Sequence, residues 1–367
     1  MRSLQALILG AAGTVALATV AHADVTVAVA GPVTGQYAVF GEQMKRGAEL
    51  AAKDLNAKGG IGGQKLQVQV GDDACDPKQA VAVANQLVNQ GVVFVDGHFC
   101  SSSSIPASGV YHDEGVLQIT PASTNPKLTE QGFNNVFRTC GRDDVQGTYA
   151  ANYVVDHKLG DKVAIVQDQS QYGKGLADEF KKQLNKRGAK ELTYEAVNQG
   201  DKDFSALITK LKSLGVQLIY YGGYHTEAGL MVRQAHDQGL DATLMSGDAL
   251  VDQQFWSITG ASGEGTLMTF APDPRKLPTA AAVVKEFEAE GYNPEGYTLY
   301  TYAAMQAFVD AATKAGSTKL DAVVKALHAN TFDTVLGPIK FDEKGDVTDP
   351  KYVMYKWHDG KYDEISG

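Results

Sequence analysis

The chain has 367 residues, of which 44% are hydrophobic and 21% are charged. This is the composition of an ordinary globular protein, so a chain disordered as a whole is excluded, and the length predicts about two domains. The formal net charge is −10, from 33 Lys and Arg against 43 Asp and Glu. Surfaces for nucleic acid or anionic lipid need clustered cations, and the sequence therefore disfavours both partners.

The first residues have the pattern of a secretory signal peptide. Arg2 is positive, Leu4–Val20 is largely apolar, and Ala21-His22-Ala23 matches an A-x-A cleavage site. A first transmembrane helix is the alternative, but the stretch is short, rich in Ala and Gly, and not followed by charged stop residues. We expect cleavage after Ala23, which removes residues 1–23 and leaves an exported mature chain.

The chain has three cysteines, too few for a disulfide scaffold. Cys75 and Cys100 each follow a predicted strand, at Leu66–Val70 and Val92–Val95, and neighbouring strands would bring them together. In an oxidising compartment we pair these two, with three free buried thiols as the alternative. Cys140 is then a lone thiol, more typical of buried packing than of a reactive group.

One pattern recurs along the chain: an apolar strand, a helix with one apolar face, and a glycine at the helix end. Strands are expected at Val25–Ala30, Leu66–Val70, Val92–Val95, Val116–Thr120, Lys162–Gln167, Gln217–Tyr221 and Thr243–Met245. Helices are expected near Phe40–Leu55, Val81–Val88, Leu176–Leu184, Phe204–Leu211 and Thr226–Gln238. Buried strands separated by helices predict parallel sheets with helices on both faces.

The pattern repeats too often for one sheet of modest size. One set of elements runs from Val25 to about Thr139, and a second runs from Asp143 to about Ala271, where prolines interrupt it. Later elements are expected as helices at Tyr297–Ala315 and Leu320–Ala329 and as strands at Pro338–Phe341 and Tyr352–Trp357. We predict an α/β fold with two doubly wound α/β lobes, joined by short segments.

Ligands of doubly wound sheets bind beyond the carboxyl ends of the strands. Here Ser101–Ser104 open a predicted helix, whose free N–H groups and hydroxyls suit a carboxylate, with plain N-capping as the alternative. Ser123 and Thr124 offer hydroxyls after another strand, or form an ordinary polar turn.

Three further residues follow strands of the second set. Asp248 is a candidate partner for an ammonium group, with a solvated turn acid as the alternative. Tyr172 and Tyr224 are candidates for the wall of a small apolar cavity, or they pack in the core. We expect His98 and His225 to form hydrogen bonds and not to bind a metal.

The common catalytic motifs are missing from the sequence. It contains no G-x-x-x-x-G-K-[ST], H-E-x-x-H, C-x-x-C or G-x-S-x-G pattern. Gly59–Gly63 follows a helix, so it predicts a turn and not a dinucleotide-binding loop. Absent motifs do not exclude an enzyme, but they make one less favoured. We predict a protein that is not an enzyme and has no catalytic residue, metal or cofactor. An exported hydrolase that uses Ser101 or Asp248 is a minor alternative.

Six stretches of the chain resemble the periplasmic leucine/isoleucine/valine-binding proteins, the soluble receptors of amino-acid ABC importers. These stretches are Asp72–Val81, Gly97–Ser102, Thr124–Pro126, Gln171–Ala177, Lys202–Ile208 and Tyr220–Tyr224. The resemblance covers the whole mature chain. It implies the type I periplasmic-binding-protein fold, in which three crossings join two lobes that close on a free amino acid. The implied lobes are residues 24–142 with 272–350 and residues 143–271 with 351–367.

Carried over by motif, the resemblance implies that Ser101 binds the ligand carboxylate. Thr124 and the Ala122 carbonyl would contact the polar head of the ligand, and Tyr172 and Tyr224 would reach it from the second lobe. The resemblance also supports the pairing of Cys75 with Cys100.

Three positions depart from the family pattern. Phe40 stands where leucine-type members have Trp, Asp248 stands where they have Glu, and Ser123 adds a hydroxyl. These departures imply a ligand drawn from the branched-chain or other small neutral amino acids. The implied setting is a periplasmic monomer that delivers its ligand to an inner-membrane ABC permease. The alternative is a sensing module of the same fold that reports to a membrane kinase or chemoreceptor, because fold alone does not separate the two.

Overall fold

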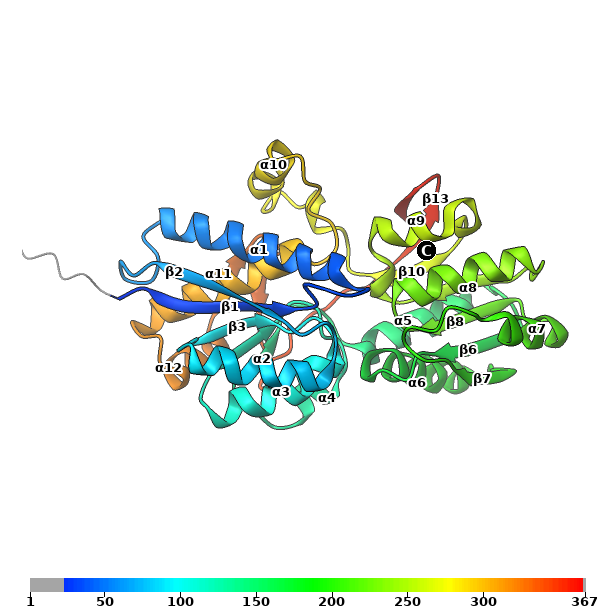
Figure 1. The fold of residues 1–367 in the computed structure, drawn as a ribbon, viewed down its shortest axis with the longest axis horizontal. Coiled ribbons are helices and arrows are strands. Elements are labelled where there is room, and N and C mark those ends of the chain that lie inside the picture. Colours follow the sequence, from blue (N-terminus) through cyan, green and yellow to red (C-terminus); the bar gives the residue numbers. More distant parts are fainter. Residues whose placement is uncertain (1–22, 366–367) are drawn as a thin grey trace, which may run out of the picture.

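The structure, a computed structural model, describes residues 23–365. The predicted signal peptide therefore lies outside the described residues, apart from Ala23. Two sheets, each with its own helices, lie side by side along the long axis of the molecule (Figure 1). We call the part around the five-stranded sheet the first lobe and the part around the seven-stranded sheet the second lobe.

The first lobe is built on a parallel sheet in the order β2-β1-β3-β4-β5. Its strands are β1 (Val25–Gly31), β2 (Leu66–Asp72), β3 (Phe94–Gly97), β4 (Leu117–Thr120) and β5 (Val136–Arg138). Its helices are α1 (Ala38–Ala57), α2 (Pro77–Asn89), α3 (Ser101–Asp113), α4 (Lys127–Glu130), α10 (Ala281–Ala289), α11 (Thr298–Ala315) and α12 (Leu320–Ala329). A separate antiparallel hairpin, β11 (Thr331–Thr334) and β12 (Gly337–Lys340), follows α12.

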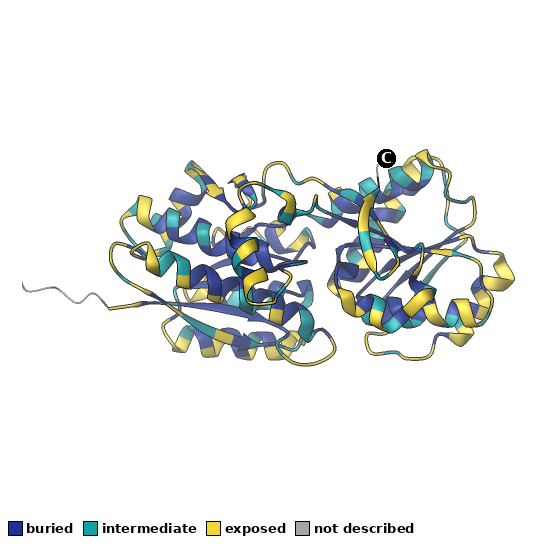
Figure 2. Cartoon of the chain, turned by 90° about the horizontal axis from the view of Figure 1, so that it is seen from above, coloured by how far each residue is buried: buried dark blue, intermediate teal, exposed yellow. Residues whose placement is uncertain are grey.

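The first lobe has a core on each face of its sheet. In β1, Val27 and Val29 join the core that includes residues of α1 and α11, while Ala28 and Ala30 join the core with α2 and α3. This alternation is the two-residue period of a strand. Figure 2 shows the result as buried strands between helices that are exposed on their outer sides. The prediction of a doubly wound sheet is confirmed.

The second lobe has the strand order β14-β13-β10-β9-β8-β6-β7. Its strands are β6 (Val163–Gln167), β7 (Thr193–Ala196), β8 (Leu218–Gly222), β9 (Thr243–Ser246), β10 (Leu267–Phe270), β13 (Val353–His358) and β14 (Lys361–Ile365). Its helices are α5 (Asp143–Asp156), α6 (Gln171–Lys186), α7 (Ser205–Leu214), α8 (His225–Asp237) and α9 (Gln253–Thr259), with short 3-10 turns η1 (Asp248–Leu250) and η2 (Gly260–Gly263). A third 3-10 turn, η3 (Pro274–Lys276), lies in the segment that leads from β10 to α10.

One edge of the second sheet is antiparallel. β13 runs antiparallel to β10, and β14 runs antiparallel to β13, whereas the other neighbours are parallel. The sheet is therefore mixed, not wholly parallel as the repeated pattern predicted. The reason is that the tail returns from the first lobe as a strand and pairs without a crossover helix of its own.

The chain crosses between the lobes three times: between β5 and α5, between β10 and α10, and between β12 and β13. The three-crossing connection is confirmed. The parallel strands of both sheets point their carboxyl ends toward these crossings, which places the strand-end residues at the junction of the lobes (Figure 1).

Within residues 23–365, none of the helices has the length and apolar character that a bilayer span needs. In the same range, His, Cys, Asp and Glu side chains do not gather in groups of three or more that could hold a metal ion.

Candidate functional site

A narrow cavity lies between the lobes at the strand ends. The residues that line it are Phe99, Ser101 and Ala122 of the first lobe, Tyr172, Tyr224, Asp248 and Ala249 of the second lobe, and Tyr297 beside α11. The cavity measures about 10 Å³, which is roughly the space of one water molecule. The two lobes are therefore closed on each other, and five of the residues that the sequence singled out meet in this one place.

The first-lobe end of the cavity is the start of α3. Ser101 is the first residue of this helix and is buried. The first N–H groups of a helix have no acceptor within the helix and carry its positive dipole end, so this end favours an anionic group. The Ser101 hydroxyl also accepts a hydrogen bond from the Asn125 backbone N–H at 3.3 Å.

A disulfide fixes the start of α3. Cys100 precedes Ser101 and is joined to Cys75, with the two Cα atoms 5.6 Å apart. Cys75 lies in the turn after β2, where its N–H donates to the Asp73 carboxylate at 2.8 Å. The predicted pairing is confirmed, and Cys140 is free and buried. The bridge ties the anion-favouring helix end to the turn after β2, although β1 lies between β2 and β3 in the sheet.

The second-lobe end of the cavity carries Asp248, whose side chain accepts two hydroxyl hydrogen bonds. The Tyr172 hydroxyl donates to Oδ1 at 2.9 Å, and the Tyr297 hydroxyl donates to Oδ2. Burial raises the pKa of Asp248, while both hydroxyls lower it because they bond to the ionised form. A cationic group would supply the charge that this buried carboxylate lacks.

A second buried acid lies close to Asp248. Asp143 is the first residue of α5, and neither of its carboxylate oxygens has a hydrogen-bond partner among the described residues. Burial is the main cause of its strongly raised pKa, and the charge of Asp248 raises it further. The charge of Arg138, which is paired with Asp346, lowers the pKa of Asp143 but does not offset the effect of burial. Sequence reasoning missed Asp143, because a lone acid at a lobe crossing has no distinguishing pattern.

Aromatic rings form the walls of the cavity. The Tyr172 and Tyr224 rings lie 5.1 Å apart, and Phe99 meets Tyr297 edge-on at 5.1 Å. Phe40 does not line the cavity but stacks behind Phe99, with ring centroids 4.3 Å apart. The size of the Phe40 side chain can therefore affect the shape of the cavity only through the position of Phe99.

Ser123 and Thr124 are buried close to the cavity without lining it. The Ser123 hydroxyl bonds to the Ser104 hydroxyl at 2.6 Å and donates to the Phe99 carbonyl at 2.8 Å. The Thr124 hydroxyl has no hydrogen-bond partner within residues 23–365, and its carbonyl accepts from the Asp143 N–H at 2.9 Å. Their contacts with a ligand stay predictions.

The two histidines form hydrogen bonds, as expected. His98 lies between Asp73 and the Tyr111 hydroxyl, at 2.6 and 2.9 Å, and His225 bonds to Gln254 at 2.7 Å. Phe99, Ala249 and Tyr297 were not singled out from the sequence. Phe99 lies in a segment that follows a predicted strand, so the strand-end rule could have identified it. Tyr297 lies far away in the sequence, and only the folded chain brings it to the cavity.

Hydrogen bonds between the lobes surround the cavity. Near α8, Glu227 accepts from Gln36 Nε2 at 3.1 Å and from the Tyr37 hydroxyl at 3.3 Å. Near α6, the Gln171 carbonyl accepts from Asn125 Nδ2 at 2.6 Å. Each of these hydrogen bonds joins a group of one lobe to a group of the other, so they can form only when the lobes are closed.

Comparison with known proteins agrees with this geometry. A family model described as periplasmic binding protein matches residues 24–361. The chain belongs to the periplasmic binding protein family. A curated relative of this binding protein, Leu/Ile/Val-binding protein homolog 1 of Brucella melitensis, is 53% identical over 358 residues, which are 96% of this chain and 96% of the relative. An amino acid binding protein of Pseudomonas aeruginosa is 48% identical over 363 residues, covering 98% and 97% of the two chains.

A solved structure has the same fold as this binding protein. It is the branched-chain amino acid transporter substrate-binding protein of Streptococcus pneumoniae in complex with isoleucine. The TM-score is 0.85 at 26% identity, and the match covers 93% of this chain and 99% of the other. The resemblance noted in the sequence is thereby confirmed at the level of family and fold.

Proposed function

We propose that this protein binds a free, small neutral amino acid between its lobes and delivers it to an ABC permease. The observation that carries the proposal is the opposed polarity of the cavity. The start of α3, with Ser101, favours an anion on the first lobe, and Asp248 offers a carboxylate on the second lobe. A zwitterion whose two charges are held by opposite lobes would draw the lobes together.

Pairing of both ligand charges is necessary because an isolated buried charge is very costly. We assign the ligand carboxylate to Ser101 and the first N–H groups of α3, and the ammonium to Asp248. Ala122 and Thr124 would contact the polar head, and Ser123 would support it from behind. The ligand side chain would lie against Tyr172, Tyr224 and Phe99, with Phe40 behind Phe99.

Ligand entry requires motion, since the closed cavity has space for roughly one water molecule. We propose that residues 24–142 with 272–350 move as one body, residues 143–271 with 351–367 as the other, and the three crossings as the hinge. Opening would break the bonds of Glu227 to Gln36 and Tyr37. Closure around an amino acid would restore them.

The cellular setting is also a proposal. Residues 1–23 would direct export and be removed, and the mature protein would act in the periplasm as a monomer. It would release the amino acid unchanged to an inner-membrane permease, with no turnover and no cofactor. The support is the A-x-A pattern in the sequence and the similarity to curated amino-acid-binding relatives.

Calorimetric titration of the mature protein with the common amino acids tests the binding proposal. We expect heat of binding for several neutral amino acids, and solution scattering should show a more compact particle when the best of them saturates the protein. Binding without compaction would contradict the hinge, and an absence of binding to every amino acid would contradict the ligand class.

A further inference from the structure

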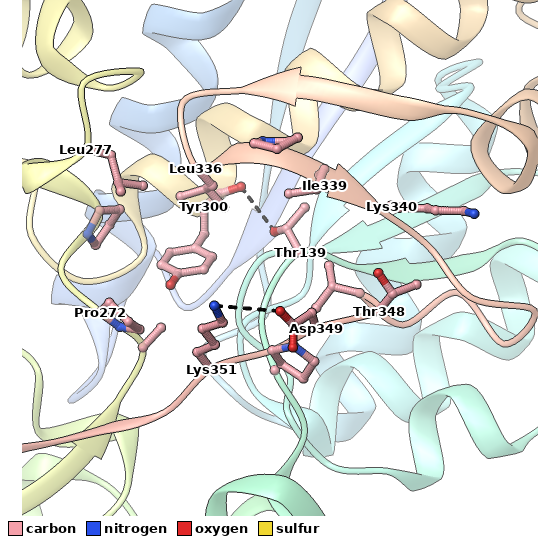
Figure 3. A pocket seen from close by; sticks show the side chains of 16 residues that line it. Thr139, Pro272, Leu277, Tyr300, Leu336, Ile339, Lys340, Thr348, Asp349 and Lys351 are labelled. Atoms are coloured by element: carbon pink, nitrogen blue, oxygen red, sulfur yellow. Dashed lines mark hydrogen bonds and ion pairs between the residues drawn. The ribbon is translucent and has the colours of Figure 1, made fainter. Parts of the chain in front are cut away.

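A second cavity lies outside the cleft, at the hinge. It measures about 460 Å³, within the roughly 300–1,000 Å³ typical of small-molecule sites. All three crossings contribute to its wall, through residues 139 and 141, residues 271–277 and residues 347–351. Figure 3 shows this cavity between the crossings, with Tyr300 and the β11–β12 hairpin closing one side.

The wall of the hinge cavity is mainly apolar. Pro272, Leu277, Leu336 and Ile339 face it together with the ring of Tyr300 (Figure 3). These side chains come from the middle crossing and from the hairpin that precedes the third crossing. An apolar ligand body of moderate length would gain free energy by leaving water for this wall.

One end of the hinge cavity is polar and favours an anion. The Lys351 ammonium and the Tyr300 hydroxyl are both turned toward its interior (Figure 3). Asp349 also lines the cavity, but it pairs with Lys351 only loosely, at 3.7 Å, and both side chains are exposed. The Tyr300 hydroxyl is not hydrogen-bonded to another residue within 23–365, so a donor and a cation are both free to meet a carboxylate.

We propose that the hinge cavity is a second binding site, for an apolar molecule with a single carboxylate, and that its occupancy favours the closed lobes. The carboxylate would meet Lys351 and the Tyr300 hydroxyl, and the body would lie along Leu277, Leu336 and Ile339. Because the three crossings must rearrange when the lobes open, a ligand fitted to the closed hinge binds that state better and shifts the equilibrium toward it.

The test uses octanoate as the probe, titrated by calorimetry into the mature protein saturated with leucine. Octanol and octylamine have the same body without the carboxylate and should bind at least threefold more weakly. The three probes are also titrated into protein without leucine, and octanoate should again bind most tightly. This second titration tests the hinge cavity even if leucine does not bind in the cleft. Displacement of leucine by octanoate would place the probe in the cleft and overturn the proposal.

Three variants locate the probe. Lys351→Gln and Tyr300→Phe should each weaken octanoate binding at least threefold, and Leu336→Trp should abolish it by filling the cavity. Lys361→Gln is the matched control, because Lys361 is also an exposed lysine loosely paired with an aspartate, at 3.9 Å, but lies on β14. Octanoate binding that survives Leu336→Trp, or that is equally weakened by Lys361→Gln, would overturn the site.

Coupling is measured by repeating the leucine titration with saturating octanoate. Thermodynamic linkage requires that octanoate change the leucine dissociation constant by the same factor by which leucine changes that of octanoate. We expect leucine to bind at least fivefold more tightly. An unchanged or weaker leucine affinity would overturn the proposed effect on closure.

Discussion

The Tyr297 hydroxyl donates a hydrogen bond to Oδ2 of Asp248, and this bond joins the first lobe to a turn of the second lobe. The bond favours the ionised carboxylate and so opposes the rise in pKa that burial causes. Asp248 is therefore kept ready to pair with a cation by a residue about 50 positions further along the chain, from a different lobe.

Tyr297→Phe should weaken amino-acid binding by about 1–3 kcal/mol, the usual contribution of a hydrogen bond to a charged group. The ring and its packing against Phe99 remain, so the loss is confined to the hydroxyl. Titration of both proteins with the best ligand measures the change. Tyr302→Phe is the matched control, because Tyr302 lies on α11, the helix that begins directly after Tyr297, and donates to Asp54 at 2.6 Å, away from the cavity. Equal losses in both variants would contradict the role of Tyr297.

Asp248→Asn should weaken binding by about 2–5 kcal/mol, as expected when one partner of a buried charge pair is removed. Asparagine keeps the shape of the side chain but cannot balance an ammonium group. The same titration measures the loss, and Asp54→Asn removes a tyrosine-bonded carboxylate that does not line the cavity. If Asp248→Asn binds within threefold of the natural protein, the ammonium is held elsewhere, and Asp143 becomes the candidate.

Much of the fold was predictable because its signals are local. The helix at Leu320–Ala329 has the bounds that its apolar spacing predicts, and Val25–Ala30 differs from β1 only at its end. The strand predicted at Val92–Val95 begins two residues later, at Phe94. Val92 and Val93 are apolar but belong to the connection between α2 and β3. Hydrophobicity alone therefore did not predict the residue at which strand pairing begins.

The candidate site was predictable only in part. The five residues that were predicted come within a few residues of a strand end, and the rule that ligands bind at strand ends brings them together. They are Ser101, Ala122, Tyr172, Tyr224 and Asp248. Tyr297 follows no strand and reaches the cavity through a lobe crossing. The sequence also could not predict that Phe40 lies behind the cavity wall. Its stacking on Phe99 depends on how α1 packs against the turn after β3.

The disulfide should stabilise both the fold and the site. Removal of the bridge by the double change Cys75→Ser and Cys100→Ser should cost about 2–4 kcal/mol of unfolding free energy, because a closed loop in the unfolded chain is lost. Amino-acid affinity should fall as well, since Cys100 anchors the start of α3 beside Ser101. Chemical denaturation measures the first effect and titration the second. Mass mapping of the non-reduced protein that finds a crosslink to Cys140 would contradict the pairing.

Stability should fall as pH rises from about 5 to 8, in part because of Asp168. Burial raises the pKa of Asp168 to about 7, and the charge of Glu227 adds to the rise. An unfolded aspartate titrates near 3.9, so between the two values the folded state binds more protons and loses stability with rising pH. The loss of unfolding free energy due to Asp168 is complete once the pH is well above 7, and it is at most about 4 kcal/mol.

Asp168→Asn should reduce this slope without abolishing it, because burial also raises the pKa of Glu227. Asparagine can keep the hydrogen bonds that Oδ1 accepts from the Ser170 N–H and hydroxyl, at 2.9 and 2.6 Å. Denaturation at pH 5 and pH 8 gives the slope for each protein. Asp237→Asn, a change of an exposed carboxylate, should leave the slope as it is. An equal slope in Asp168→Asn and the natural protein would show that Asp168 stays ionised.

The last prediction concerns which amino acids are accepted. Phe40 is smaller than Trp and supports the cavity wall through Phe99, and Asp248 is one methylene shorter than Glu. A pocket change of one methylene is worth only about 1–3 kcal/mol, so these differences should flatten the ranking of ligands and not abolish any of them. Ser123 adds a buried hydroxyl near the polar end, which also favours tolerance.

We therefore expect several small or medium neutral amino acids to bind within about 100-fold of one another, a spread of about 2.7 kcal/mol. Charged side chains should be rejected, because Tyr172, Tyr224 and Phe40 offer no compensating charge, and Asp248 would repel a further carboxylate. Titration with leucine, valine, alanine, proline and 4-aminobutyrate measures the spread, with glutamate and lysine as controls. Leucine, isoleucine and valine binding more than about 1,000-fold tighter than all others, a gap of about 4.1 kcal/mol, would show that the departures leave the pocket narrow. Tight binding of glutamate would place an unrecognised cation at the cavity.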